Sequence, residues 1–264
     1  MHALGLDNRL SIDDEGLSCP LELHDVLTDC YRQSDTALLR WLSAQPDGEA
    51  DSGCTATTAL IRSDRIIVAN VGDSRAILCR KGHSVDLSTE HRVYGRGPMV
   101  AEEIKRVEAG GGWVDDGRVC GVLAVSRAFG DADFKAPHLE RLLKRGVEDG
   151  HWDEAFASTI RFTADPVTSE PDVFEMTTEA GDDEFVVVAT DGLWDVLSSQ
   201  EVASLVRSDL RKGKSPEEVA HRLTQVAVKR STWDNTSVIV IDLLGEEGWK
   251  GHGPTKKKGL FGLF

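Results

Sequence analysis

The sequence lacks the features that identify several large classes of protein. Its 264 residues contain 30 Lys and Arg against 45 Asp and Glu, a formal net charge of −15, so it has no basic excess of the kind that binds nucleic acid. It has no apolar stretch long enough to cross a bilayer, and no basic segment followed by an apolar one at its N-terminus. We therefore expect no nucleic-acid partner, no transmembrane segment, and a cytoplasmic or nuclear location.

Cysteine-based sites and phosphate loops are missing as well. The five cysteines are widely spaced, with no Cys-x-x-Cys pair, which argues against a zinc site, and their odd number argues against a complete disulfide framework. Cys54 and Cys79 fall in strand-like runs, where we expect small buried apolar side chains. The glycine triplet at 110–112 lacks the Gly-Lys-Ser/Thr ending of a phosphate loop, so it predicts a helix stop.

The composition present is that of a folded chain, with 40% apolar and 28% charged residues. We expect an N-terminal loop over 1–21, one folded domain over 22–243, and a flexible tail over 244–264. The chain is expected to be a monomer. In the tail, three lysines beside an apolar segment give only a weak attraction to an anionic membrane, so disorder is the preferred interpretation.

Apolar spacing and turn residues predict the elements of this domain. A helix is expected over 22–44, with a core-facing stripe at helical spacing that consists of Leu23, Val26, Leu27, Cys30, Leu38, Trp41 and Leu42. A three-strand meander should run from 54 to 80, with a turn near 63–64. Further predictions are a helix over 99–109, a hairpin over 113–123, and helices that begin at the capping residues Ser198 and Ser215.

Residues 136–162 form a segment unlike its surroundings, with one amphipathic helix expected in it. It is either a substrate or partner element near the site or a surface excursion, and the second interpretation is preferred because loops tolerate insertion.

Acidic residues stand at the ends of three strand-like runs. Asp191 follows the run at 185–188, with Gly192 to allow close backbone approach and Asp195 one turn later. Asp234 immediately precedes a run at 236–241, and Asp73 lies in the turn between two more runs. Each acid alone is usually a turn former. Rigidly held carboxylates are also the ligands that hard divalent cations need, so together they suggest a metal site.

The segments around these acids resemble the metal-dependent type 2C protein serine/threonine phosphatases, the PPM family. The resemblance spans about 22–243 and rests on blocks in family order at 52–56, 69–76, 109–111, 123–131, 183–195 and 234–235. It implies an α+β fold, an antiparallel β-sandwich flanked by helix pairs, with a binuclear Mn²⁺ or Mg²⁺ centre. It further implies that a metal-bound water attacks phosphoserine or phosphothreonine in protein substrates.

The same resemblance assigns roles to residues of this chain. Asp191 and Asp234 correspond to direct ligands of the first metal. Asp73, with Asp191 and Asp195, resembles the weaker third-metal site of some members. Gly192 and Arg127 are expected to lie around these ligands, and Arg127 either faces the cleft or locks the neighbouring loop.

The sequence departs from the family at its N-terminal side. Residues 1–51 contain no Asp-Gly-His-Gly-Gly motif, so the family's bridging Asp, proton-donating His and phosphate-binding Arg have no counterpart, and no catalytic residue is identified. The chain is expected to be N-terminally incomplete, with little or no turnover, at most one weak metal site and an open sheet edge. The alternative is a catalytically impaired binding module.

Overall fold

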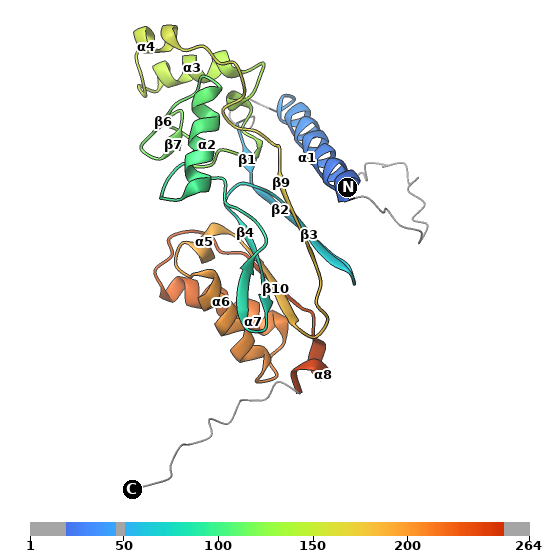
Figure 1. The fold of residues 1–264 in the computed structure, drawn as a ribbon. Helices are drawn as coiled ribbons and strands as arrows, with labels where there is room; N and C mark the ends of the chain where they lie inside the picture. Colours follow the sequence, from blue (N-terminus) through green and yellow to red (C-terminus); the bar gives the residue numbers. More distant parts are fainter. Residues whose placement is uncertain (1–19, 46–50, 251–264) are drawn as a thin grey trace.

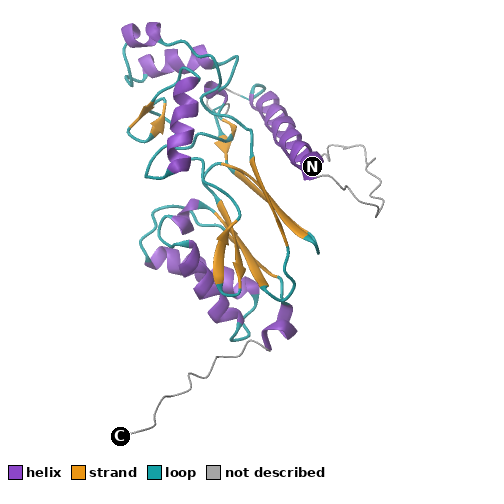
Figure 2. Ribbon diagram, viewed as in Figure 1, coloured by secondary structure: helices purple, strands orange, loops and turns teal. Residues whose placement is uncertain are grey.

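The computed structural model describes residues 20–45 and 51–250, and its centre is two antiparallel sheets (Figures 1 and 2). The four-stranded sheet has the order β11-β10-β4-β5, with β11 (Val238–Asp242), β10 (Asp183–Ala189), β4 (Arg75–Arg80) and β5 (His83–Asp86). The three-stranded sheet has the order β2-β3-β9, with β2 (Ala56–Ile61), β3 (Arg65–Val71) and β9 (Asp172–Thr177). Together they form the expected sandwich.

Helices cover the outer faces of this sandwich. Side chains of β3 and β4 alternate along the strand, because successive residues of a strand point to opposite faces. Ala76 and Leu78 of β4 pack against β3 between the sheets, whereas Ile77 and Cys79 pack against α6 (Ser199–Leu210) and α7 (Pro216–Lys229). On the other side, α1 (Pro20–Leu42) packs against β3 through Leu27 and Tyr31. The α+β sandwich with flanking helices is confirmed, although α1 covers its sheet alone within the described residues.

The meander predicted over 54–80 is only partly correct. β2 and β3 pair as a hairpin, with Ala59 opposite Val68, and the turn falls at the predicted place. β4, however, pairs with β10 in the other sheet. The prediction failed because strand spacing along the chain does not tell whether a tight turn continues one sheet or crosses between two.

The stripe predicted for the first helix is also partly wrong. Leu27 and Leu42 are buried as expected, but Val26 and Trp41 are 49% and 58% exposed. Cys30 is exposed as well. The helix presents Thr28, Tyr31 and Asp35 to the core instead.

The connection between β5 and β9 carries the remaining predicted elements. Helix α2 (Pro98–Ala109) is confirmed and ends at Gly110, and the hairpin of β6 (Val114–Asp115) and β7 (Arg118–Val119) turns through Asp116 and Gly117, both at positive φ. A short pair, β1 (Gly53–Cys54) with β8 (Phe129–Gly130), precedes the 3₁₀ turn η1 (Ala132–Phe134). The segment 136–162 contains α3 (Leu139–Glu148) as expected and a second helix, α4 (Glu154–Thr159). Figure 1 places both at the end of the molecule opposite α8.

Two boundaries and one cysteine differ from the sequence predictions. The first helix begins at Pro20, and residues 245–250, assigned to the flexible tail, form α8 (Gly245–Lys250), whose Trp249 is 7% exposed. The rest of the predicted tail and the loop over 1–19 lie outside the described residues. Cys79 is buried as expected, but Cys54 is exposed. In the part of the chain that the structure describes, no helix combines the length and apolarity needed to cross a bilayer.

Candidate active site

The pairing of the four-stranded sheet brings three acid-bearing loops to one edge. Ala189, the last residue of β10, lies opposite both Val238, the first residue of β11, and Arg75, the first residue of β4. The loops beyond these three strand ends therefore emerge side by side. They carry Asp191 after β10, Asp234 before β11 and Asp73 before β4, so antiparallel register alone explains why acids so distant in sequence share one region.

Backbone contacts fasten the loops of Asp191 and Asp234 together. The N–H of Thr190 donates to the carbonyl of Ser237 at 3.1 Å, and the N–H of Ser237 donates to Oγ1 of Thr190 at 3.0 Å. Asp191 then opens the short helix α5 (Asp191–Trp194). A Cβ on Gly192 would lie 2.5 Å from the carbonyl oxygen of Asn235. Only glycine permits this approach, which agrees with the close backbone approach expected there.

These acids lie near enough for their charges to affect one another. Burial raises the pKa of Asp191, and the charges of Asp234 and Asp195 raise it further. Burial likewise raises the pKa of Asp73 to about 6, with a contribution from the charge of Asp191. Such clustering is unfavourable without a cation, because each carboxylate disfavours ionisation of the next.

Arg92 lies among these acids and was not singled out from the sequence. Its Nη1 donates to Oδ1 of Asp195 at 3.1 Å and to the hydroxyl of Tyr94 at 3.0 Å. Its Nη2 donates to Glu90. Burial raises the pKa of both Asp73 and Asp191, and the positive charge of Arg92 partly opposes that rise. A signal for this role is hard to find in the sequence, since Arg92 and Asp195 are 103 positions apart.

His91 fixes the turn that carries Asp73. The His91 N–H donates to the carbonyl of Gly72 at 3.0 Å, and the Gly72 N–H donates to Nδ1 of His91 at 3.1 Å. Nδ1 is therefore the unprotonated ring nitrogen, and Nε2 carries the hydrogen. Nε2 lies 3.1 Å from Oδ2 of Asp172. The nearby His91 ring and the charge of Arg127 hold the pKa of Asp172 below its usual range, although burial opposes them.

Arg127 joins α2 to β9 and is not among the groups that contact Asp73, Asp191, Asp195 or Asp234. Its guanidinium lies 2.7 Å from Glu103 of α2 and 2.8 Å from Asp172 at the start of β9. Of the two roles considered from the sequence, the structure shows the locking one. Its effect on Asp73 is indirect, through Asp172 and His91.

The donor atoms of the cluster suit a hard divalent cation. Asp73, Asp191, Asp195 and Asp234 offer carboxylate oxygens, the ligands that Mg²⁺ and Mn²⁺ prefer. Within residues 20–45 and 51–250, however, no three Asp, Glu, His or Cys side chains are grouped closely enough to bind one ion together. One contributor to this is visible: the Asp195 carboxylate is engaged by Arg92. The residues therefore fit the ion by chemistry, while their side chains are not gathered around one point.

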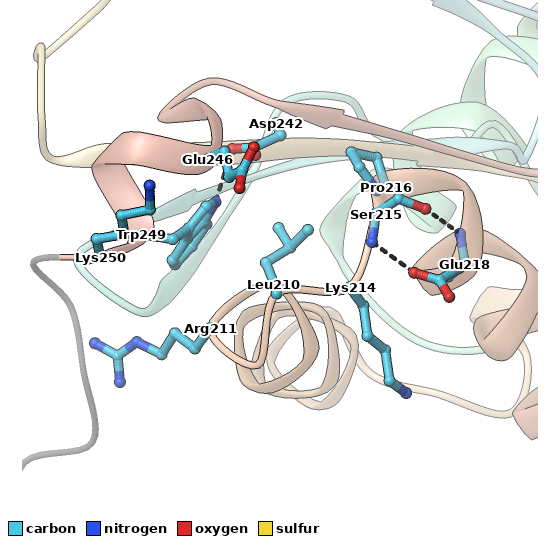
Figure 3. A pocket seen from close by; sticks show the side chains of 11 residues that line it. Leu210, Arg211, Lys214, Ser215, Pro216, Glu218, Asp242, Glu246, Trp249 and Lys250 are labelled. Atoms are coloured by element: carbon cyan, nitrogen blue, oxygen red, sulfur yellow. Dashed lines mark hydrogen bonds between the residues drawn. The ribbon is translucent and has the colours of Figure 1, made fainter.

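A cavity of about 510 Å³ lies away from these acids, between the α6–α7 turn and α8 (Figure 3). Trp249 and Leu210 line it, and Nε1 of Trp249 donates to Asp242 at 3.0 Å. Figure 3 also shows the capping box of Ser215 and Glu218 at the start of α7. None of Asp73, Asp191, Asp195 and Asp234 lines this cavity, so we do not assign it to the candidate active site.

Comparison with known proteins agrees with this fold. The family model "Protein phosphatase 2C" matches residues 8–236. "Protein phosphatase 2C 57" of Arabidopsis thaliana is 43% identical over 228 residues, which cover 86% of this chain and 58% of that protein, so the chain spans little more than half of this relative's length.

Two solved structures share the fold. A Caenorhabditis elegans sex-determining protein has a TM-score of 0.65 at 22% identity, covering 90% of this chain and 51% of that one. Serine-threonine phosphatase 2C from Toxoplasma gondii has a TM-score of 0.63 at 18% identity, and the match covers 84% of this chain and 68% of that one. Because the family model matches residues 8–236, most of this chain, the chain belongs to the protein phosphatase 2C family.

Proposed function

We propose that this chain hydrolyses phosphoserine and phosphothreonine in proteins with the help of Mn²⁺ or Mg²⁺. The observation that carries the proposal is the gathering of Asp73, Asp191 and Asp234 at one edge of the four-stranded sheet in a protein phosphatase 2C fold. The metal dependence that is general to this family supports the same conclusion.

The chain's own residues would perform the following tasks. Asp191 and Asp234 would hold the ion from two loops that hydrogen bonds between Thr190 and Ser237 join. Asp73 adds a third carboxylate from a turn that His91 fixes. When bound, the ion neutralises phosphoryl oxygens and activates water. Because the protein carries a net charge of −15, attraction of a phosphorylated substrate must come from the ion and not from the surface as a whole.

The test is phosphate release from phosphoserine and phosphothreonine peptides with Mn²⁺, with Mg²⁺ and with chelator. We expect slow, metal-dependent release, because the sequence has no counterpart of the family's bridging Asp. The Asp191→Asn variant should fall to the chelator level, whereas Asp182→Asn, an acid at the opposite end of β10, should keep the wild-type rate.

Two results would count against the proposal. Equal rates of phosphate release with metal and with chelator would show that the reaction does not need a metal. Phosphopeptide binding without any release would favour the alternative of a binding module that has lost turnover.

A further inference from the structure

Arg92 is held inside the acid cluster by contacts on several sides. Its side chain is only 14% exposed. Glu90 and Asp195 accept hydrogen bonds from its two terminal nitrogens, and the Tyr94 ring lies 5.0 Å from the guanidinium carbon. Glu90 also pairs with Arg75, whose Nη2 lies 2.9 Å from Oε1 of Glu90. These contacts fix one orientation of the guanidinium, with one terminal nitrogen facing Asp195.

The Asp195 carboxylate has two competing uses. Asp195 follows Asp191 by one helical turn, and the charges of both carboxylates interact. A divalent ion near Asp191 would therefore find a further oxygen donor in Asp195, but Arg92 occupies one oxygen of that donor at 3.1 Å. An ion placed there would also meet the repulsion of the nearby guanidinium.

We propose that Arg92 is a resident cation that a divalent ion must displace from Asp195, so that Arg92 sets the affinity of this site for the ion. The inference rests on the metal assignment in the proposed function. It also accounts for the position of the Asp195 carboxylate, which accepts a hydrogen bond from Arg92.

One nitrogen of Arg92 lacks a hydrogen-bond partner in the described structure, which lowers the cost of moving the guanidinium away from Asp195. Its Nε is buried and has no hydrogen-bond partner among the described residues. A buried donor without a partner destabilises the arrangement, so the position next to Asp195 is less favourable than a fully bonded one. Displacement by an ion relieves that cost.

The test is a Mn²⁺ titration by calorimetry on the full chain, comparing wild type with Arg92→Gln. Removal of the resident positive charge should lower the dissociation constant about tenfold, the scale expected for one charge beside a partly buried ion. The control is Arg62→Gln, which removes the same charge from the β2–β3 turn, where the side chain is 60% exposed and pairs with Asp64. That variant should bind Mn²⁺ within twofold of wild type.

Arg92→Met removes the charge but keeps an unbranched side chain, and it serves if the Gln variant does not fold, as judged by circular dichroism. A dissociation constant that is unchanged or higher in a folded Arg92 variant overturns the inference, as does the absence of Mn²⁺ binding in the wild type and the variant alike.

A second measurement uses the unaltered protein. The ¹⁵N resonance of Arg92 Nε should shift on saturation with Mg²⁺, because the guanidinium leaves Asp195, and a resonance that stays in place would contradict displacement. Phosphopeptide hydrolysis by the same samples separates the two proposals. Tighter Mn²⁺ binding without hydrolysis would support the role of Arg92 and refute the proposed reaction.

Discussion

Asp234 is the strand-end acid whose replacement tests the ion site most directly. It is exposed and its charge raises the pKa of Asp191. In Asp234→Asn a neutral amide replaces one of the carboxylates that attract the ion, so we expect Mn²⁺ affinity to fall at least about tenfold. Calorimetry measures the change, with Asp182→Asn as the matched control. Equal affinities in Asp234→Asn and wild type would show that Asp234 is not a ligand.

Glu103 provides a pH-dependent test of the network behind the site. It is 2% exposed, and although burial alone would raise its pKa, hydrogen bonds and charge from Arg127 and Arg106 lower it to about 2. Because the pKa of Glu103 is lower in the folded protein than in the unfolded chain, the ionised carboxylate stabilises the fold at pH values above 4.5, the pKa of the unfolded chain. This stabilisation is lost as the pH falls from 4.5 toward 2. It amounts to about 3 kcal/mol.

We therefore expect Glu103→Gln to lower the free energy of unfolding by about 3 kcal/mol at pH 7. Urea unfolding at a series of pH values measures the difference from wild type, which should be constant above pH 4.5 and shrink below it. A difference that does not change with pH would assign the loss to packing and not to the ionised carboxylate.

The residues of the site were only partly predictable. The strand-end acids could be found, because turn chemistry next to a strand-like run is a local pattern. Arg92 could not, since its contact with Asp195 depends on side-chain direction across two loops that are far apart in sequence. Arg127 illustrates the same limit: its motif marks a family segment, but only the positions of Glu103 and Asp172 decide between the two roles considered for it.

At the scale of elements, the α5 turn depends on Gly192. In an open helix, alanine is favoured over glycine by about 1 kcal/mol. In Gly192→Ala the added Cβ would meet the carbonyl oxygen of Asn235 at 2.5 Å. The loops of Asp191 and Asp234 must then separate, so we expect a loss of about 1–3 kcal/mol in unfolding free energy together with weaker Mn²⁺ binding.

Urea unfolding and calorimetry measure the two effects. Gly110→Ala is the matched control, because its φ is −79° and the nearest atom to an added Cβ lies 3.3 Å away. If both glycine variants behave alike, the close approach at Gly192 has no special importance for the site.

Elements with local signals were predicted well and those with distant partners were not. The capping boxes at Ser198 and Ser215 mark where α6 and α7 begin, because a cap is satisfied within four residues. Sheet membership is different: β4 leaves β3 because Val186 and Phe185 of β10 offer a pairing partner from more than 100 residues away. Helix α8 was missed for a similar reason, since Trp249 is buried against distant core residues.

At the scale of the whole molecule, β11 is an exposed edge. Among the described strands it pairs only with β10, and its Ile239 is 59% exposed while the nearby Trp233 is fully exposed. Such an edge offers unpaired backbone groups to another chain. We expect self-association at high protein concentration that Ile239→Lys reduces, as sedimentation velocity would show, with little change in thermal stability.

Val228→Lys is the control for this edge, because Val228 is 68% exposed but lies on α7. If both lysine variants reduce association equally, added charge and not the strand edge is responsible.

The turn between β3 and β4 has a consequence for the mechanics of the fold. It is the shortest covalent connection between the two sheets, and it carries Asp73, while a hydrogen bond from Gly72 to His91 holds the turn beside it. An ion that binds the Asp73 carboxylate would therefore restrain β3 in one sheet and β4 in the other. Ion occupancy should therefore be readable far from the ion, as slower amide hydrogen exchange along β3 as well as β4.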